Sequence, residues 1–162
     1  MRKKILVACF SATHTTRRLA QTIAQVTGGD QYDIEPKKPY TPDDLNWSNP
    51  ASRSSVEMRD KSSRPEVQGN PGVTAPYDVI FLGFPIWWYV APTVVNSFLE
   101  GENLTGKIIV PFATSGGSDM GGTEAALSPS APGAVFKPGK VLSASTSQTD
   151  VRRWVDSLGL DK

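Results

Sequence analysis

The stretch Lys4-Ile5-Leu6-Val7-Ala8-Cys9-Phe10 decides the fold, because it is continuously apolar after its first residue and a polar stretch follows it. An apolar run of this length is typical of a strand that is buried on both faces of a parallel sheet. Further along, Leu19, Ile23 and Val26 have the i, i+4, i+7 spacing of one helix face. The beginning of the chain therefore predicts a strand, a loop and a helix over residues 15–26.

The same order recurs along the chain. Buried strands are predicted at Tyr77–Gly83 and Lys107–Ala113, a weaker strand at Tyr32–Glu35 and a last one at Lys140–Ala144. Helical patterns occupy Ala91–Leu99, Thr123–Leu127 and Thr149–Leu158. Repeated strand–loop–helix units predict an α/β fold with an open sheet and helices on both of its faces.

Residues 36–76, which we call the excursion, differ in composition from the rest. They hold seven of the 13 prolines, few aliphatic residues and many polar ones. Short helices are possible near residues 42–47 and 52–61. An irregular segment of this length inside a domain is commonly functional. Because neither flank looks self-sufficient and the chain has 162 residues, we expect a single domain over 1–162.

Charge and composition exclude several classes of protein. The chain has 17 Lys+Arg against 16 Asp+Glu, a net charge of +1, whereas nucleic-acid binders normally carry a basic excess. No apolar run approaches the roughly 18 residues of a membrane helix. The apolar residues before Cys9 are too few for a signal peptide, so a cytoplasmic location is expected. One cysteine and one histidine support neither a disulfide nor a metal site.

The first loop after a predicted strand is rich in hydroxyl groups. Ser11, Thr13, Thr15 and Thr16 surround the start of the first helix, where exposed N–H groups and the helix dipole favour an anion. A helix cap without a ligand needs only one hydroxyl. The loop therefore predicts a site for a phosphate ester. His14 in this loop either donates a hydrogen bond to the phosphate, acts as the base of a reaction, or is only a solvated loop residue.

Two other chemistries fit this loop less well. A cysteine phosphatase would use Cys9 as its nucleophile and needs an arginine six positions later, where this chain has Thr15. Cys9 is better interpreted as a small buried apolar residue. A receiver domain needs an acidic cluster for magnesium at the end of the first strand, and none stands there.

Two further loops also leave the carboxyl ends of predicted strands, where open α/β sheets bind ligands. In the second, consecutive aromatic residues suit stacking on a planar ligand, although a hydrophobic plug or a dimer contact is the alternative. Its candidate residues are Pro85, Ile86, Trp87, Trp88 and Tyr89. The third loop is rich in glycine and lets the backbone approach a ligand closely. Its candidate residues are Thr114, Ser115, Gly116, Gly117 and Ser118.

Together the three loops resemble those of the flavodoxin family. Ser11-x-Thr13-x-Thr15-Thr16 is similar to the family's phosphate loop, Gly83-x-Pro85-x-Trp87 to its second flavin loop, and Thr114-Ser115-Gly116-Gly117 to its third. The Pro-Ile-Trp-Trp motif and the excursion most resemble those of a bacterial flavodoxin-like branch. The resemblance implies a doubly wound, five-stranded parallel sheet of order 2-1-3-4-5 with flavin mononucleotide (FMN) as the cofactor.

Two departures from the family pattern bear on function. His14 stands where the family usually has glycine, and no aromatic residue stands in the third loop. Trp88 or Tyr89 then covers the second face of the flavin ring, or that face is open to a substrate. The second loop carries no acidic residue or histidine, so no catalytic side chain is predicted.

Three functions follow from these observations. The first is an electron carrier between redox partner proteins. The second is an FMN oxidoreductase that takes hydride from NAD(P)H and reduces a quinone or a similar acceptor, which the near-neutral charge favours. The third is a non-redox module that binds another phosphate ester.

Overall fold

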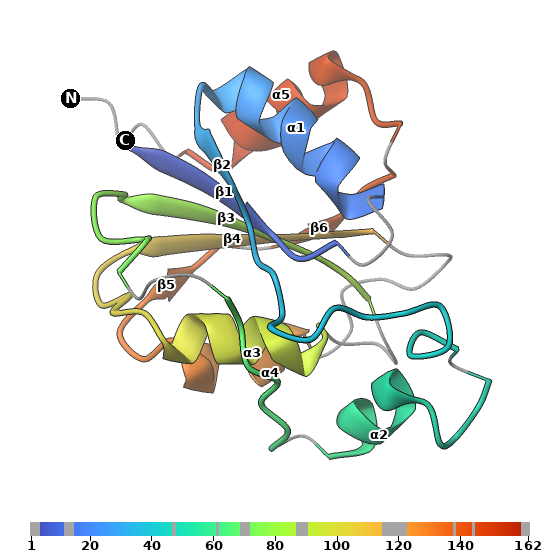
Figure 1. Cartoon of the computed structure of the whole chain (residues 1–162). Coiled ribbons are helices and arrows are strands. Elements are labelled where there is room, and N and C mark those ends of the chain that lie inside the picture. The colour runs from blue at the N-terminus through green and yellow to red at the C-terminus, as the bar shows by residue number, and fades with distance from the viewer. Residues whose placement is uncertain are drawn as a thin grey trace.

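A parallel sheet forms the centre of the molecule, and its strands follow the apolar runs of the sequence (Figure 1). The computed structural model describes residues 4–11, 15–46, 48–60, 62–68, 72–86, 91–114, 123–137, 139–143 and 145–159. The strands are β1 (Ile5–Cys9), β2 (Asp30–Asp33), β3 (Val79–Pro85), β4 (Ile108–Thr114), β5 (Val135–Phe136) and β6 (Lys140–Val141). Every described strand pair in this sheet is parallel.

The strand order β2-β1-β3-β4-β5 confirms the expected doubly wound sheet, with one difference at its edge. The fifth position holds two short strands, because β5 pairs with the first half of β4 and β6 with its second half. Pro138 stands between them in the sequence and has no N–H to donate to a ladder. The predicted last strand at residues 140–144 is thus shorter than expected, and β5 was missed.

Helices cover both faces of the sheet, as predicted. Figure 1 shows α1 and α5 on one face and α3 and α4 on the other. Their bounds are α1 (Thr15–Thr27), α2 (Arg53–Arg59), α3 (Thr93–Glu100), α4 (Thr123–Leu127), the 3₁₀ turn η1 (Ser128–Ser130) and α5 (Gln148–Ser157). Among the described parts of the chain, no helix is long and apolar enough to cross a membrane.

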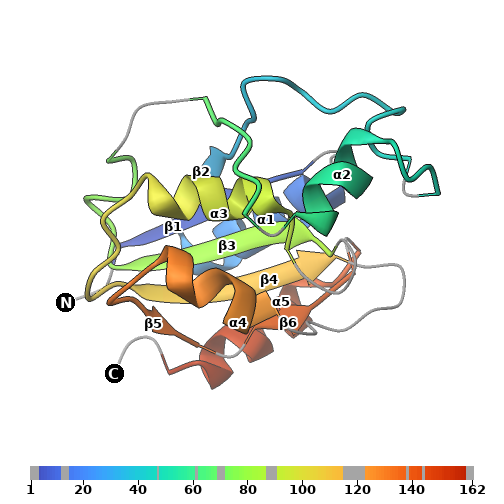
Figure 2. The ribbon, with the colours of Figure 1, turned by 90° about the horizontal axis from the view of Figure 1, so that it is seen from below.

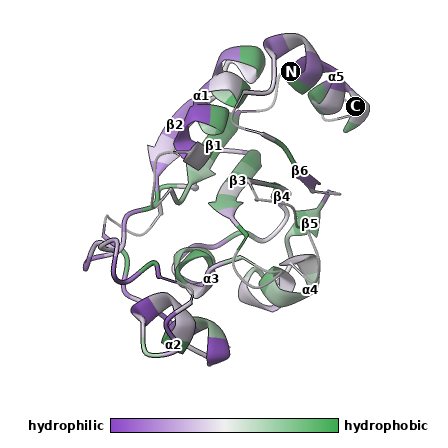
Figure 3. Ribbon diagram, turned by 90° about the vertical axis from the view of Figure 1, so that its right-hand side faces the viewer, coloured by the Kyte–Doolittle hydropathy of each residue, from purple (hydrophilic) through white to green (hydrophobic). Residues whose placement is uncertain are grey.

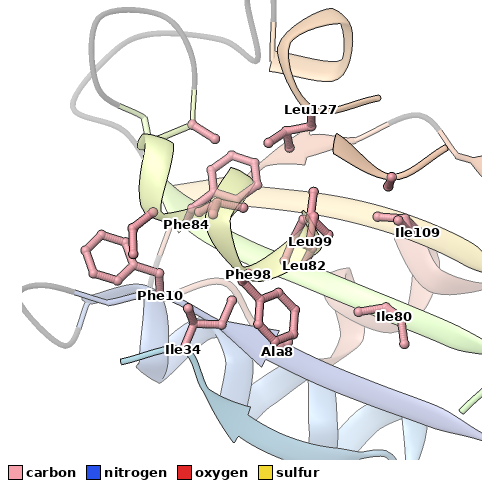
Figure 4. Packing of buried hydrophobic residues seen from close by; sticks show 14 of the residues in the cluster. Ala8, Phe10, Ile34, Ile80, Leu82, Phe84, Phe98, Leu99, Ile109 and Leu127 are labelled. Atoms are coloured by element: carbon pink, nitrogen blue, oxygen red, sulfur yellow. The ribbon is translucent and has the colours of Figure 1, made fainter. Parts of the chain in front are cut away.

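Alternate residues of the central strands enter two separate cores. Val7, Phe81 and Val110 face α1 and α5, while Leu82 and Ile109 face α3. Figure 4 shows the second of these cores, in which Phe98 and Leu99 of α3 lie over the sheet. In Figure 3, β3 and much of α3 carry apolar residues, whereas α2 and α5 carry strongly polar ones. Burial of the strands on both faces explains their uninterrupted apolar sequence.

Gly83 has a structural role within β3. A Cβ atom at this position would lie 2.3 Å from the ring of Phe112, its partner on β4. Close approach of an aromatic ring is one of the reasons for a glycine inside a strand. The glycine of the Gly83-x-Pro85-x-Trp87 motif is therefore required by packing beneath the second loop.

The excursion folds back on itself and is closed at its base. Pro36 and Val67 form an antiparallel bridge, and the backbone N–H groups of Lys37 and Gln68 donate to the carbonyls of Glu66 and Glu35. Helix α2 lies within the excursion, at the end of the sheet where β3 and β4 terminate (Figures 1 and 2). It confirms the helix expected near residues 52–61.

A second predicted helix, near residues 42–47, is not formed over the described residues 42–46. These residues adopt turns, in which the N–H of Thr41 donates to the Asp44 carboxylate and the N–H of Asp44 donates to the Thr41 hydroxyl. Local side-chain bonds of this kind compete with helix formation. Strand β2 is also displaced from its predicted bounds by two residues and is mostly exposed.

Candidate functional site

The carboxyl ends of β1, β3 and β4 meet at one edge of the sheet, and the three predicted loops leave from there. Six of the candidate residues are described, and they are Ser11, Thr15, Thr16, Pro85, Ile86 and Thr114. The others lie outside the described residues, and they are Thr13, His14, Trp87, Trp88, Tyr89, Ser115, Gly116, Gly117 and Ser118. The candidate site is therefore built from the bases of the loops.

A hydrogen bond joins the first candidate loop to the third. The hydroxyl oxygens of Thr16 and Thr114 lie 2.8 Å apart, and either one can be the donor. Both residues are buried, with 2% and 8% of their surface exposed. A hydroxyl has one proton and two acceptor positions, so each side chain keeps further capacity after this bond is made. The pair fixes the first turn of α1 against the end of β4.

Thr114 also contacts the base of the second loop. It pairs with Pro85 across β3 and β4, and its carbonyl accepts a 3.0 Å hydrogen bond from the N–H of Ile86. Pro85 and Ile86 are half-buried. One residue at the end of β4 therefore connects all three candidate loops.

The N-terminus of α1 offers donors and no negative charge. The Ser11 hydroxyl accepts a 3.1 Å hydrogen bond from the N–H of Arg17, so it acts as a cap and still has its own proton to donate. Thr15 is exposed in the first turn, which contains no acidic residue. Together with the helix dipole, these groups make the end of α1 suitable for an anion.

Arg17 is held beside this end by Asp33. Its Nε and Nη2 atoms lie 3.3 and 3.1 Å from the two carboxylate oxygens of Asp33, the last residue of β2. Cys9 lies nearby and is buried in the core that faces α1. Burial, with a smaller contribution from Asp33, raises the pKa of the Cys9 thiol to about 12. Cys9 is therefore a neutral core residue and not a thiolate nucleophile, as the sequence indicated.

Thr93 was missed by the sequence analysis. It is the first residue of α3, directly after the second loop, and only 6% of its surface is exposed. Its buried hydroxyl has no hydrogen-bond partner among the described residues. A buried hydroxyl without a partner is unfavourable. Thr93 is thus a candidate donor at the start of α3, where Pro92 provides no side-chain cap.

A pocket of about 230 Å³ lies on the β2 side of the first loop. We call it the β2-side pocket. Its polar lining consists of Ser11, Arg17, Asp33, Glu35 and Gln68. Its other lining residues are Cys9, Phe10, Ile34, Pro36, Pro39 and Tyr40. The acidic residues Asp33 and Glu35 are the sequence signal that could have indicated this pocket. They lie at the carboxyl end of β2, at the same edge of the sheet as the three candidate loops.

Metal binding finds no support in the part of the chain that the structure describes, where no three His, Cys, Asp or Glu side chains form a ligand cluster. The chemistry of the site therefore depends on hydroxyls, backbone N–H groups and the Arg17–Asp33 pair.

Comparison with known proteins identifies relatives over almost the whole chain. The sequence profile of the flavodoxin family matches residues 4–158. A structure from Bacteroides eggerthii, described as that of a flavoprotein, is 46% identical and has a TM-score of 0.92, with 98% of this chain and 99% of that one covered. A second such structure, from Bacteroides uniformis, is 44% identical with a TM-score of 0.90, and covers 96% of this chain and 99% of its own.

A more distant structure shares the fold. The flavoprotein of Lactobacillus acidophilus in complex with FMN is 18% identical, has a TM-score of 0.71, and the match covers 98% of this chain and 99% of that one. A comparison with curated proteins gives no significant match. The strand order, the three loop bases at one sheet edge and the profile match agree, and the chain belongs to the flavodoxin family.

Proposed function

We propose that this protein binds FMN at the edge where β1, β3 and β4 end, and transfers electrons between redox partners. The observation that carries the proposal is the Thr16–Thr114 hydrogen bond, because it draws the bases of the three candidate loops together. The two Bacteroides relatives, which are described as flavoproteins, support a flavin as the ligand.

The end of α1 fits the phosphate group of FMN. Ser11 and Thr16 supply hydroxyls there, the first turn carries no carboxylate, and the Arg17 guanidinium lies beside it, paired with Asp33. An anion at such a helix end is stabilised by the unpaired N–H groups and the dipole. Thr13, His14 and Thr15 complete the proposed phosphate site.

The proposed ring site lies between the second and third loops. Pro85 and Ile86 would place the aromatic residues Trp87, Trp88 and Tyr89 against the ring. Thr114, Ser115, Gly116, Gly117 and Ser118 would place backbone groups along its polar edge. Thr93, whose buried hydroxyl has no partner among the described residues, supplies a donor that a polar ligand atom can satisfy.

The flavin, when bound, supplies the redox chemistry, and the chain binds it, orients it and excludes water. The second loop, residues 84–92, contains no charged residue. Its side chains therefore offer no carboxylate or imidazole for proton transfer. An uncharged, apolar environment also makes additional negative charge on the flavin ring unfavourable, which lowers the reduction potential of the flavin.

An FMN-dependent oxidoreductase is the second candidate. The net charge of +1 favours it, because a carrier that docks on partners by charge has a strong excess of one sign. The third loop also has no aromatic residue, which would leave one face of the ring open to NAD(P)H and a quinone.

The absorbance spectrum of the purified protein tests the cofactor. We expect a yellow protein that releases FMN on denaturation, and an apoprotein that binds added FMN. A colourless protein that fails to bind FMN would contradict the proposal. Trp87→Ala should weaken FMN binding, and unchanged affinity would remove Trp87 from the site.

Anaerobic reduction separates the two candidates. Two resolved one-electron steps with dithionite and no reaction with NAD(P)H support the carrier. Rapid bleaching of the flavin by NADH or NADPH, followed by reoxidation with a soluble quinone, supports the oxidoreductase.

A further inference from the structure

The β2-side pocket has an apolar floor and a polar rim. The buried members of its lining lie at the ends of β1 and β2, whereas its charged and amide side chains are exposed or half-buried. Phe10 and Ile34 are part of the floor and are seen in Figure 4. The volume of about 230 Å³ is below the roughly 300–1,000 Å³ of sites that enclose a drug-sized ligand. The pocket therefore fits a small molecule or a single side chain.

Tyr40 forms one wall of the pocket and is fixed in place. Its ring packs edge-on against Phe10, with the two centroids 5.6 Å apart. The Arg53 guanidinium lies over the Tyr40 ring, 3.8 Å from the centroid, and the Tyr40 hydroxyl donates to Glu57. Arg53 and Glu57 form an ion pair with a 2.9 Å separation. The wall is therefore preorganised, which reduces the entropy cost of packing an apolar chain against it.

The rim offers hydrogen-bond acceptors. The Arg17 guanidinium is engaged by Asp33, since its Nε and Nη2 atoms lie 3.3 and 3.1 Å from the two carboxylate oxygens. The amide nitrogen of Gln68 donates to the Pro36 carbonyl at 3.3 Å, so the amide oxygen is the atom left to accept. Glu35 has no ion-pair partner among the residues that the structure describes, and an ionised carboxylate can only accept.

The charges of the lining favour a cation. Two carboxylates, Asp33 and Glu35, and one guanidinium, that of Arg17, give a formal charge of −1. Lys37, the basic residue that follows Glu35 most closely in the chain, pairs with Glu66 at 3.4 Å and does not line the pocket. The carboxylate of Glu35 is therefore the charge that a ligand can neutralise.

Other classes of ligand fit this lining less well. An anion would be repelled by the excess carboxylate. A neutral planar ring would cover Glu35 without giving it a partner, and a desolvated carboxylate without a partner is unfavourable. An ammonium or guanidinium group on an apolar stem suits both parts of the pocket, because the cation donates to the carboxylate while the stem covers the floor.

We propose that the β2-side pocket binds an organic cation, in the form of an ammonium or guanidinium group on an apolar stem. The cation donates to the Glu35 carboxylate and the Gln68 amide oxygen. The stem lies against Phe10, Pro39 and Tyr40. The cation belongs either to a free amine or guanidine or to a lysine or arginine of a partner protein. None of these contact residues is part of the proposed FMN site, so this proposal goes beyond the proposed function and needs no flavin.

Titration of the protein with butylguanidinium, followed by NMR of the backbone amides, tests the cation site. We expect saturable shifts confined to the pocket, over residues 9–11, 33–40 and 68, and about tenfold weaker binding of butylurea, the uncharged analogue. Glu35→Gln should raise the Kd of butylguanidinium about 3- to 10-fold, as the loss of one charged hydrogen bond at an exposed rim predicts.

Asp43→Asn is the matched control for Glu35. Asp43 is an exposed carboxylate of the excursion that does not line the pocket, so its loss removes the same charge without touching the site. The Kd of butylguanidinium should stay within about twofold. The proposal is overturned if butylguanidinium and butylurea bind equally well, or if Glu35→Gln weakens butylguanidinium no more than Asp43→Asn does.

A blocked peptide, acetyl-alanyl-arginyl-alanine amide, distinguishes the two sources of the cation. If it binds within about threefold of butylguanidinium and Glu35→Gln weakens it equally, the pocket admits a side chain of a partner protein. If it binds more weakly than that, the peptide backbone is excluded and the ligand is a free amine or guanidine. A protein that binds butylguanidinium in this selective way but not FMN refutes the proposed function alone. A protein that binds FMN but does not distinguish butylguanidinium from butylurea refutes only the cation site.

Discussion

The central strands of the sheet are held by side chains without polar atoms, whereas the excursion is held by hydroxyl, carboxylate and guanidinium groups. Phe81, Leu82 and Val110 are completely buried between helices. In the excursion, Glu57 accepts hydrogen bonds from Tyr40 and Arg53. Its C-terminal part is held in the same way, by Arg64 on Glu100 of α3 and by Glu102, which accepts three hydrogen bonds from Gly72 and Thr74.

Because of this difference, the sheet provides the global stability of the molecule, whereas the excursion can open locally. Apolar burial is non-directional and proportional to area, so the sheet depends on the whole set of its core side chains. Polar contacts are few and directional, so a single substitution can release a segment of the excursion while the sheet stays folded. The β2-side pocket lies where these two regions meet, with Phe10 from the core and Tyr40 from the excursion.

Truncation of Phe81 is the largest change that the comparison predicts. Phe81 lies in the middle of β3, is 0% exposed and packs edge-on against Trp154 of α5. We expect Phe81→Ala to lower the free energy of unfolding by about 3–5 kcal/mol, measured by urea denaturation. Val56→Ala, at a 49% exposed position of α2, should change it by less than about 0.5 kcal/mol. Equal effects of the two variants would refute the distinction between the regions.

The sheet was predictable because its strands are buried on both faces. Residues 79–83 and 108–113 form uninterrupted apolar runs, and such runs have few alternatives in an α/β chain. The positions of the candidate loops followed from the strands, because ligand sites of open sheets lie at the carboxyl ends. The strand order came from the resemblance to flavodoxins.

The edges and the polar contacts were harder to predict. Strand β2 has the sequence Asp-Gln-Tyr-Asp and is mostly exposed, so its pattern is weak. The Thr16–Thr114 bond joins residues 98 positions apart, and no local pattern encodes such a pair. Thr93 looked like an ordinary first residue of a helix, and only the packing around it shows that its hydroxyl is buried.

Removal of Arg53 should loosen the excursion selectively. In Arg53→Gln, the carboxylate of Glu57, whose side chain is 13% exposed, loses its cationic partner. We expect the free energy of local opening at residues 40–59 to fall by about 1–3 kcal/mol, measured by amide hydrogen exchange. Exchange in β1, β3 and β4 should remain unchanged.

Arg59→Gln is the matched control for Arg53. Arg59 belongs to the same helix, is exposed and donates to a single neutral acceptor, the carbonyl of Pro50. Its loss should change local opening by less than about 1 kcal/mol. If Arg53→Gln also accelerated exchange in the central strands, the excursion and the sheet would be one cooperative unit.

Thr114 makes the buried polar contact that links the candidate loops, and it is expected to act through Thr16. If the Thr16 hydroxyl donates to a phosphate, it must accept from the Thr114 hydroxyl, since it has one proton only. Thr114→Val should then weaken FMN binding about 3- to 10-fold, or about 1 kcal/mol, and leave riboflavin, which lacks the phosphate, within twofold. Thr114→Ser should restore FMN affinity. Equal losses for FMN and riboflavin would assign Thr114 a purely structural role.

The smallest expected effect concerns the contact between Arg64 and Glu100. Hydrogen bonds from Arg64 and Ser130 hold the pKa of Glu100 below its ordinary value of 4.5. Because the folded-state pKa is the lower one, the charged carboxylate stabilises the fold above pH 4.5, and this contribution is lost as the pH falls through the folded-state value.

Both side chains are about one-third exposed or more, so solvent limits the effect to less than about 1 kcal/mol. We therefore expect Glu100→Gln to lower the free energy of unfolding slightly at pH 6, and this difference to disappear as the pH falls through the folded-state pKa of Glu100 and the carboxylate becomes protonated. A difference between the two proteins that does not change with pH in the acid range would show that the contact with Arg64 does not depend on this charge, and that packing around Glu100 holds the excursion instead.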